Sequence, residues 1–241
     1  MPHLAAWQWM LGGFSAFMIG VAKTGAPGIG TLVAPLMVIL VGDARHAPAW
    51  ALPVLLTADV FAVWYWRKHA EARQLFALAP WVVAGIVGGA VALGLEEAII
   101  RRMLGVIVFG MLAIYLYRRF SSASEVHGSP ALYGLATGFS STVANAAGPV
   151  MSLYLLSKNL PKEQFVATGT WFFLVLNLAK VPVYVYHTLF SAESLTFDVM
   201  MIPLVLCGAF AGRWLVRVMP QKLFETGVIV MTAVSCLLLF R

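Results

Sequence analysis

The chain has 241 residues, of which 61% are hydrophobic and 11% charged, and its mean hydropathy is +0.87. Water-soluble domains carry about 25% charged residues, so this composition excludes a soluble globular domain and predicts an all-α integral membrane protein. The net charge of +6 does not indicate nucleic-acid binding, because the basic residues lie in short turns between apolar segments. That pattern is typical of cytoplasmic anchoring of membrane spans.

The first apolar segment is interrupted by a short polar stretch, Val21-Ala22-Lys23-Thr24-Gly25-Ala26-Pro27-Gly28. Apolar runs lie on both sides of it, from 4 to 22 and from 29 to 41. Glycine and proline are unfavourable inside a helix, so the backbone is expected to unwind here. A second interruption, Val143-Ala144-Asn145-Ala146-Ala147-Gly148-Pro149, lies in the other half of the chain. Two broken hydrophobic segments at matching positions indicate the binding site of a secondary transporter.

The two halves match each other when the chain is shifted by about 122 residues. This predicts two repeats, 1–120 and 131–241, joined by a polar linker at 121–130. The matched pairs include Gly12 with Gly134, Pro27 with Pro149, Trp50 with Trp171, Asp59 with Lys180, Pro80 with Pro203, Gly85 with Gly208 and Gly89 with Gly212.

Each repeat is expected to contain a broken helical hairpin followed by three transmembrane helices. The arms of the second hairpin are too short to cross a bilayer at about 1.5 Å per residue, so we expect them to be re-entrant. Three crossings per repeat would place the repeats in opposite orientations. The expected hairpins cover about 4–41 and 131–157, and the expected spans about 47–66, 74–94, 99–118, 165–186, 198–215 and 222–240.

The distribution of basic residues agrees with inverted repeats. The turn with Arg67, Lys68 and Arg73 is rich in positive charge, whereas the equivalent turn from 187 to 198 has no Lys or Arg and carries Glu193 and Asp198. Equivalent turns of opposite charge are expected on opposite sides of the membrane. This arrangement places both termini outside and predicts a multi-pass protein of the bacterial inner membrane.

Three charged residues are expected at membrane depth: Lys23, Asp59 and Lys180. A charge at the bilayer centre costs about 2.5–3.5 kcal/mol on insertion scales, so these side chains should face the protein interior or water. Their sum is one positive charge, which suits an anion. Lys23 is interpreted either as a substrate contact or as a cation at a half-helix C-terminus.

Asp59 and Lys180 occupy equivalent positions of the two repeats, so a pseudo-two-fold axis would bring them face to face. Two interpretations remain open. In one, Lys180 binds substrate and Asp59 carries a coupling proton; in the other, the two form a static ion pair that fixes helix register.

Helix N-termini and hydroxyl groups near the breaks are expected to add donors for an anion. Pro27 and Pro149 suit the first position of the half-helix that follows each break, which would leave free N–H groups on Gly28 and its neighbours. For any single hydroxyl, bonding back to its own helix is the competing interpretation. The predicted substrate-binding residues are Lys23, Thr24, Gly28, Ser140, Ser141, Thr142, Asn145, Asn177 and Lys180.

Two glycine pairs, Gly85 with Gly89 and Gly208 with Gly212, predict faces for close helix packing. They are expected either inside the protomer or at a homodimer contact. No cofactor, metal site, nucleic-acid partner or catalytic set is indicated.

The motifs around the two breaks resemble the TauE/SafE sulfite exporter family. The residues concerned are Gly12-Gly13-Phe14 before the first break, and Gly138-Phe139-Ser140 leading to Asn145 and Pro149. The resemblance implies proton-coupled export of a small sulfur-containing anion such as sulfite, thiosulfate or an organosulfonate.

Two functions from other classes remain as alternatives. A passive anion channel could use the same charges and helix ends, and counterflow would distinguish it. A retinal-type photoreceptor could use Lys180 as a Schiff-base lysine with Asp59 as counter-ion, but the duplicated breaks argue against it. A membrane enzyme is the least favoured interpretation.

Overall fold

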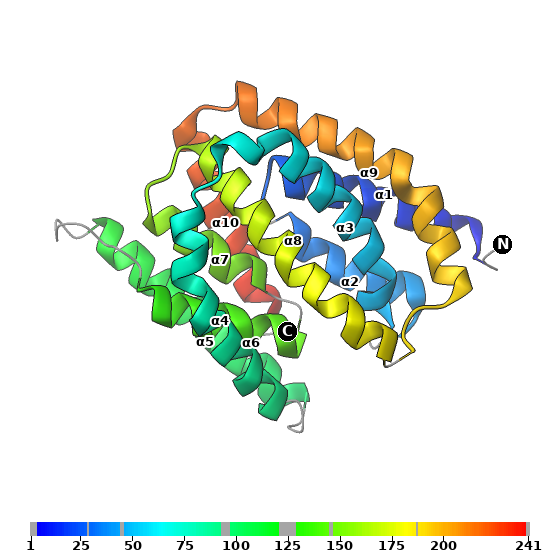
Figure 1. Cartoon of the computed structure of the whole chain (residues 1–241), viewed down its shortest axis with the longest axis horizontal. Coiled ribbons are helices and arrows are strands. Elements are labelled where there is room, and N and C mark those ends of the chain that lie inside the picture. Colours follow the sequence, from blue (N-terminus) through cyan, green and yellow to red (C-terminus); the bar gives the residue numbers. More distant parts are fainter. Residues whose placement is uncertain are drawn as a thin grey trace. The chain divides into compact units, whose positions relative to one another are not determined.

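The structure is a computed structural model that describes residues 4–27, 29–43, 46–92, 97–120, 129–144, 147–186 and 188–239. All regular elements in these ranges are helices, which confirms the all-α prediction. In chain order they are α1 (Ala6–Thr24), α2 (Gly30–Val41), α3 (Ala47–Trp66), the 3₁₀ turn η1 (Arg67–His69), α4 (Ala72–Ala92), α5 (Glu97–Phe120), α6 (Pro130–Ala144), α7 (Ala147–Ser157), α8 (Lys162–Tyr186), α9 (Ala192–Val218) and α10 (Gln221–Leu239) (Figure 1).

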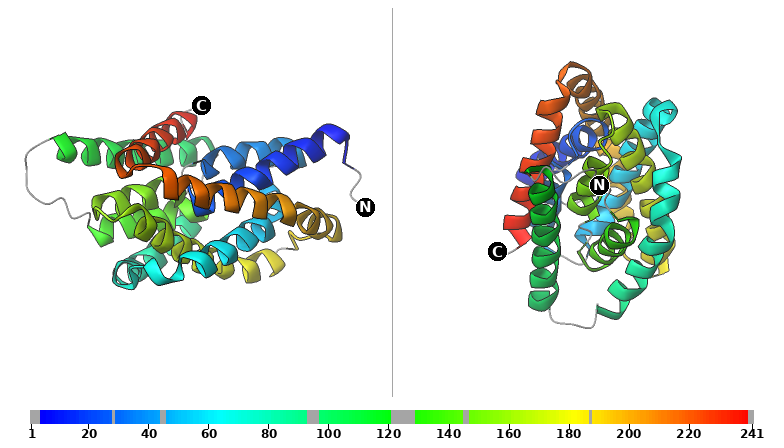
Figure 2. Two further views of the ribbon diagram at one scale, coloured as in Figure 1. Left: turned by 90° about the horizontal axis from the view of Figure 1, so that it is seen from above. Right: turned by 90° about the vertical axis from the view of Figure 1, so that its left-hand side faces the viewer.

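The helices form two compact units, and each combines elements from both halves of the sequence. Unit 1 comprises 1–70 and 166–220, and unit 2 comprises 71–165 and 221–241. In unit 1, α1 packs along α9, and α3 packs on both (Figure 1). In unit 2, α4 packs along α6, and α10 lies against α5 (Figure 2).

The helices follow the predicted spans closely. The predicted span 47–66 coincides with α3, four others differ by at most three residues at either end, and α9 begins six residues before the predicted span 198–215. Among the described residues, four helices are long and apolar enough by length and composition to cross a membrane: α3 with η1, α4, α8 and α9. In α5 a shorter stretch, Gly105–Tyr117, is apolar. The opposite orientation of the two repeats remains a prediction.

Helices lie on both sides of each predicted break. α1 ends at Thr24 and α2 begins at Gly30, while α6 ends at Ala144 and α7 begins at Ala147. The arms of the second hairpin are short, with 15 residues in α6 and 11 in α7. The first hydrophobic segment therefore does not continue as one helix through 25–27. In the second, residues 145–146 lie outside the described part of the chain, and Gly148 and Pro149 lie within α7.

The prediction that each proline opens the following half-helix was wrong. Pro27 lies in the turn before α2, where Ile29 N–H donates to the Ala26 carbonyl at 3.2 Å, and the helix starts at Gly30. Pro149 is the third residue of α7, which begins at Ala147. Proline is tolerated throughout the first helical turn because those N–H groups have no partner within the helix, so its position does not fix the first residue.

Glycines let the backbones of α1 and α9 touch in unit 1. A Cβ on Gly20 would lie 2.1 Å from the Val205 carbonyl oxygen, and one on Gly208 would lie 2.1 Å from the Phe17 carbonyl oxygen. Any larger residue at either position would force the two helices apart. Gly12 likewise accommodates the buried ring of Phe197, which packs on the rings of Trp9 and Trp50.

Unit 2 uses the same packing between α4 and α6. A Cβ on Gly85 would lie 2.3 Å from the Leu135 carbonyl oxygen, and one on Gly138 would lie 2.1 Å from the Val82 carbonyl oxygen. Both predicted glycine faces therefore pack against helices of the same chain, which was one of the two predicted roles. A homodimer remains a prediction without support from these glycines.

The two helix pairs differ in register from the sequence match. The sequence match equates Val82 of α4 with Val205 of α9. Gly138 packs against the Val82 carbonyl, and Gly20 packs against the Val205 carbonyl. The shift of about 122 residues, however, equates Gly20 with Thr142, one helical turn beyond Gly138. The same small-residue contact is thus made one turn apart on α1 and α6.

Alanine at Gly85 and at Gly88 should have opposite effects on stability, although both glycines lie in α4. Gly85→Ala is expected to destabilise the protein by about 1–3 kcal/mol or more, because its Cβ would overlap the α6 backbone. Gly88 has no atom within 4 Å of its added Cβ, so Gly88→Ala should be neutral or stabilising by up to about 1 kcal/mol. Thermal unfolding of both variants in one detergent measures the difference; equal melting temperatures would contradict the α4–α6 contact.

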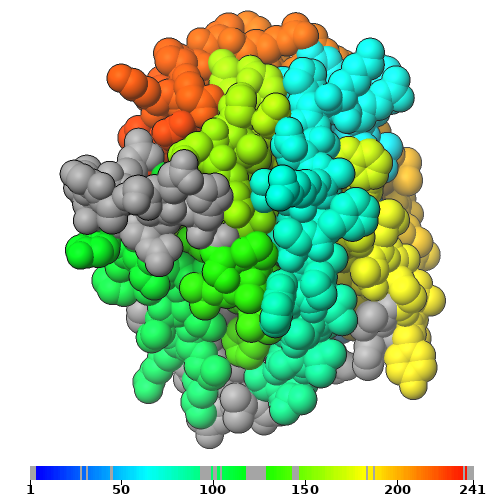
Figure 3. All heavy atoms as spheres, turned by 60° about the vertical axis from the view of Figure 1, so that its left-hand side comes forward, coloured from blue at the N-terminus to red at the C-terminus, as the bar shows by residue number. Residues whose placement is uncertain are grey.

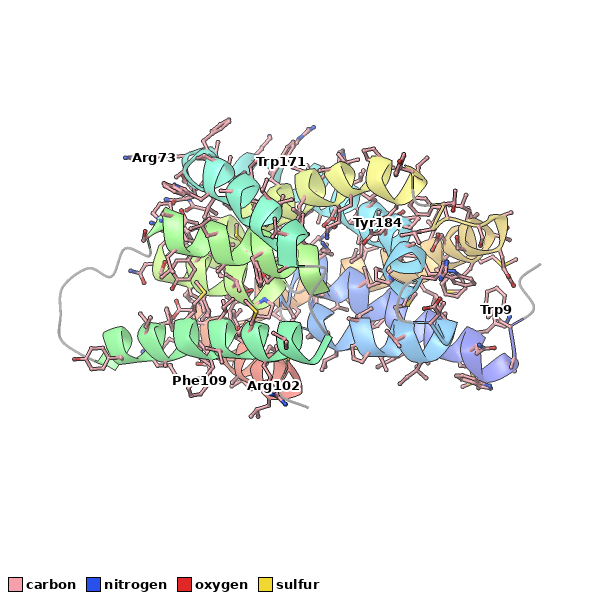
Figure 4. The ribbon with its side chains drawn as sticks, turned by 90° about the horizontal axis from the view of Figure 1, so that it is seen from below. Trp9, Arg73, Arg102, Phe109, Trp171 and Tyr184 are labelled. Atoms are coloured by element: carbon pink, nitrogen blue, oxygen red, sulfur yellow. The ribbon has the colours of Figure 1, made fainter. Side chains whose placement is uncertain are left out.

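The outer side of α4 is strongly apolar. Phe76, Val83, Val87 and Val91 are 77%, 61%, 60% and 81% exposed, and the space-filling view shows the outward side chains of α4 along one face of the molecule (Figure 3). On α5, Phe109 is likewise exposed (Figure 4). Exposed apolar helix faces of this extent are expected where a protein contacts lipid.

Candidate functional site

The end of α1 is fixed against α9 at the first break. A Cβ on Gly25 would lie 2.0 Å from the Gly212 carbonyl oxygen, so the two backbones are in contact. The Thr24 hydroxyl lies 2.9 Å from the Gly20 carbonyl oxygen and 2.7 Å from the Ala209 carbonyl oxygen. These contacts hold the last turn of α1, and with it Lys23, in a defined position.

Lys23 forms a buried ion pair with Asp59. The Lys23 ammonium lies 2.8 Å from Asp59 Oδ1; the lysine side chain is 12% exposed and the aspartate side chain is fully buried. The other oxygen, Asp59 Oδ2, accepts a hydrogen bond from Asn177 Nδ2 at 2.7 Å. The carboxylate is thus held by a cation from α1 and an amide from α8.

One face of α8 lines this cluster. Phe173, Asn177 and Lys180 follow at helical spacing, and the Phe173 ring lies beneath the Lys23 ammonium at 4.5 Å from its centroid. One turn earlier, the Thr170 hydroxyl lies 3.3 Å from the Lys23 carbonyl oxygen and 2.6 Å from the Val166 carbonyl oxygen.

Lys180 lies close enough to interact electrostatically with both Lys23 and Asp59. The structure thus brings the three predicted charged residues together within unit 1. The Lys23 ammonium forms the ion pair with Asp59, and Lys180, the residue predicted to face Asp59, interacts electrostatically with the same carboxylate. Asn177, one turn before Lys180, is the residue of α8 that donates to the carboxylate.

The formal charges of Lys23, Asp59 and Lys180 sum to one positive charge. A buried site with excess positive charge favours an anion. An anion that contacts Lys23 would compete with Asp59 for the same ammonium group. The site therefore allows the Lys23 ammonium to change its ionic partner from the Asp59 carboxylate to a bound anion.

The hydroxyl groups before the second break differ in their partners. Thr142 donates to the Gly138 carbonyl at 2.9 Å, and Ser140 donates to the Thr137 carbonyl at 3.2 Å. Ser141 is 4% exposed, and its hydroxyl has no hydrogen-bond partner in the described part of the chain. Of the three, Ser141 has a donor available to a ligand. Gly28 and Asn145, also predicted to bind substrate, lie outside the described residues.

Asp198, predicted to lie at the end of a polar turn, is instead a buried residue of α9. It lies in the second turn of α9, is 5% exposed, and neither carboxyl oxygen has a hydrogen-bond partner among the described residues. The helix starts earlier than expected because Ser191 and Ser194 cap it reciprocally. That pair of serines is a sequence signal that would have moved the boundary.

The contacts of the Lys23 ammonium with Phe173, and of its carbonyl with Thr170, were also missed. Phe173 and Thr170 lie on the same face of α8 as Asn177 and Lys180, because all four are spaced three or four residues apart. This spacing is the sequence signal that could have identified them.

The comparisons with known proteins agree with this membrane architecture. The family model described as "Sulfite exporter TauE/SafE" matches residues 10–239, nearly the whole chain. The chain belongs to the TauE/SafE sulfite exporter family. Neither the curated proteins nor the solved structures that were compared gave a match.

Membership of this family, together with four apolar helices of spanning length, identifies the chain as a multi-pass membrane transporter. The TauE/SafE match includes both breaks and all three charged residues of the Lys23 cluster, because it extends from 10 to 239. The resemblance noted from the glycine-rich motifs is confirmed.

Proposed function

We propose that this TauE/SafE protein is a secondary active transporter that exports a small sulfur-containing anion across the bacterial inner membrane. The observation that carries the proposal is the buried Lys23–Asp59 ion pair at the first helix break. Sulfite, thiosulfate and organosulfonates all present oxyanion groups that an ammonium can bind. The excess positive charge contributed by Lys180 favours such an anion over a cation or a neutral solute.

Exchange of partners at Lys23 couples the anion to a proton in this account. When the anion binds Lys23, Asp59 loses its nearest cation while remaining fully buried. A buried carboxylate without a counter-ion is strongly unfavourable, and protonation removes its charge. Anion binding therefore promotes proton uptake by Asp59, and the two ligands cross the membrane by alternating access in the same conformational cycle.

We also propose that the hydroxyl of Ser141 donates to the transported anion. Ser141→Ala should weaken sulfite binding by about tenfold, the effect of losing one hydrogen bond to a charged group at about 1.5 kcal/mol. Ser140→Ala is the matched control, because the Ser140 hydroxyl is used by the Thr137 carbonyl. Calorimetric titration of both variants with sulfite tests the assignment, and equal affinities would refute it.

The substrate is tested by flux into proteoliposomes. Labelled sulfite, thiosulfate and sulfoacetate are each presented with and without an imposed pH gradient. The proposal expects saturable flux of at least one of them that responds to the gradient. Flux of none of the three, or flux unaffected by pH, would contradict proton-coupled transport of a sulfur-containing anion.

A further inference from the structure

A second cationic site lies at the end of unit 1 where α3 and α9 terminate. The guanidinium group of Arg213 lies over the ring of Tyr65, 4.4 Å from its centroid, and that of Arg217 lies 5.5 Å from the same centroid. Arg217 also donates a hydrogen bond to the Tyr65 hydroxyl. Two arginines one helical turn apart thus share one aromatic ring, and we call Tyr65, Arg213 and Arg217 the arginine shelf.

A second aromatic ring, that of Phe210, also contacts the Arg213 guanidinium. Phe210 packs edge-on against Phe61 at 5.0 Å between ring centroids, and the Arg213 guanidinium lies 5.7 Å from the Phe210 ring. A guanidinium stacked on a ring directs its N–H groups outward around its edge. Arg213 therefore presents planar donors that match the oxygens of a phosphate, and Arg217, which donates to the Tyr65 hydroxyl, adds a second positive charge beside it.

The surroundings of the shelf are those of a membrane interface. Trp64 and Trp214 are 62% and 64% exposed, and exposed tryptophans at span ends are typical of the headgroup level. Apolar side chains such as Val60 and Val218, 57% and 56% exposed, lie on the same two helices. Segments 61–71 and 207–219 carry three further basic residues, Arg67, Lys68 and His69, and one acid, Glu71.

We propose that the arginine shelf binds the phosphate group of an anionic phospholipid. Basic clusters at span ends attract anionic headgroups, and the shelf adds the planar donors of the stacked Arg213 to that attraction. The exposed tryptophans and apolar side chains of α3 and α9 would contact the glycerol region and acyl chains. A free phosphate ion gains nothing from these apolar neighbours, so the surroundings favour a lipid. The shelf shares no residue with the Lys23 cluster.

The test compares lipid selectivity in matched charge variants. Arg213→Gln/Arg217→Gln removes two charges from the shelf, and Arg73→Gln/Lys222→Gln removes two exposed charges elsewhere. Arg73 points away from α4 at the surface of unit 2 (Figure 4). Each detergent-purified protein is titrated with phosphatidylglycerol or phosphatidylcholine, and bound lipid is counted by mass spectrometry of the intact protein.

Wild type and the Arg73/Lys222 control should prefer phosphatidylglycerol at least about tenfold, and the shelf variant should lose that preference. Unchanged preference in the shelf variant, or none in wild type, would overturn the proposal. If the double variant does not fold, Tyr65→Leu, which keeps both charges but removes the ring, should reduce the preference, and no reduction would overturn it. Inorganic phosphate that displaces the lipid at equal concentration would assign the shelf to a small anion instead and would also overturn it.

Discussion

Replacing Lys23 with methionine is expected to stop anion transport and to destabilise the protein by about 3–5 kcal/mol, the cost of leaving one member of a buried ion pair without its partner. Asp59 is fully buried, and its Oδ1 lies 2.8 Å from the ammonium that the substitution removes. Sulfite binding measured by calorimetry and thermal unfolding in the same detergent would give the two effects separately.

The double variant Lys23→Met/Asp59→Asn separates binding from stability. It removes both charges and keeps an acceptor oxygen for Asn177 at position 59, so most of the lost stability should return while sulfite binding does not. Lys222→Met, at an exposed position of α10, is the matched lysine control and should keep both properties. Recovery of sulfite affinity in the double variant would show that Lys23 does not contact the anion.

Replacing Asp59 with asparagine alone is expected to uncouple transport from the proton. The side chain keeps its shape and its hydrogen bond with Asn177 but cannot take up a proton, and it no longer competes for Lys23. Sulfite exchange should therefore continue, with binding at least as tight as in wild type, while net flux driven by a pH gradient is lost. Proteoliposome assays of exchange and of gradient-driven flux measure the two activities on one preparation.

Glu193→Gln is a suitable control for Asp59→Asn, because Glu193 is an exposed acid in the first turn of α9. It should leave both exchange and gradient-driven flux at wild-type levels. Should Asp59→Asn still respond to the pH gradient, another group carries the proton. Asp198, buried without a hydrogen-bond partner among the described residues, would be the first to test.

The helices could be predicted from the sequence because their limits are local. Apolar runs long enough to span a bilayer define α3, α4, α8 and α9, and glycine with proline defines the first break. Boundaries failed where two local signals competed. Pro27 suggested a helix start, yet α2 begins at Gly30; the Ser191–Ser194 cap was overlooked, and α9 begins at Ala192.

The pairing within the site could not be predicted, because it depends on how the helices pack. The sequence identified Lys23, Asp59 and Lys180 as the charges at membrane depth, and the structure brings them together. Repeat symmetry suggested that Asp59 faces Lys180. It gave no indication that the contact of Gly25 with Gly212 positions the end of α1 so that Lys23 pairs with the same carboxylate.

Hydroxyl groups show the same limit. Ser140 and Ser141 are neighbours of the same type, and no sequence pattern distinguishes them. Only the helix rotation decides that Ser140 bonds to the Thr137 carbonyl while the hydroxyl of Ser141 is left without a partner in the described residues. Rotation of a helix about its axis is set by tertiary packing. A single sequence therefore predicts that this group of hydroxyls lies near the break, but not which hydroxyl is left without a partner.

The most direct test of the central claim is counterflow of labelled sulfite in proteoliposomes that contain wild type or Lys23→Met/Asp59→Asn. A carrier that binds its anion at Lys23 predicts that unlabelled sulfite inside the vesicles accelerates entry of the label for wild type, and that the double variant shows no such acceleration. Flux of label in wild type without trans-stimulation would indicate a passive channel. Equal trans-stimulation in both proteins would show that the anion crosses without using the Lys23–Asp59 pair.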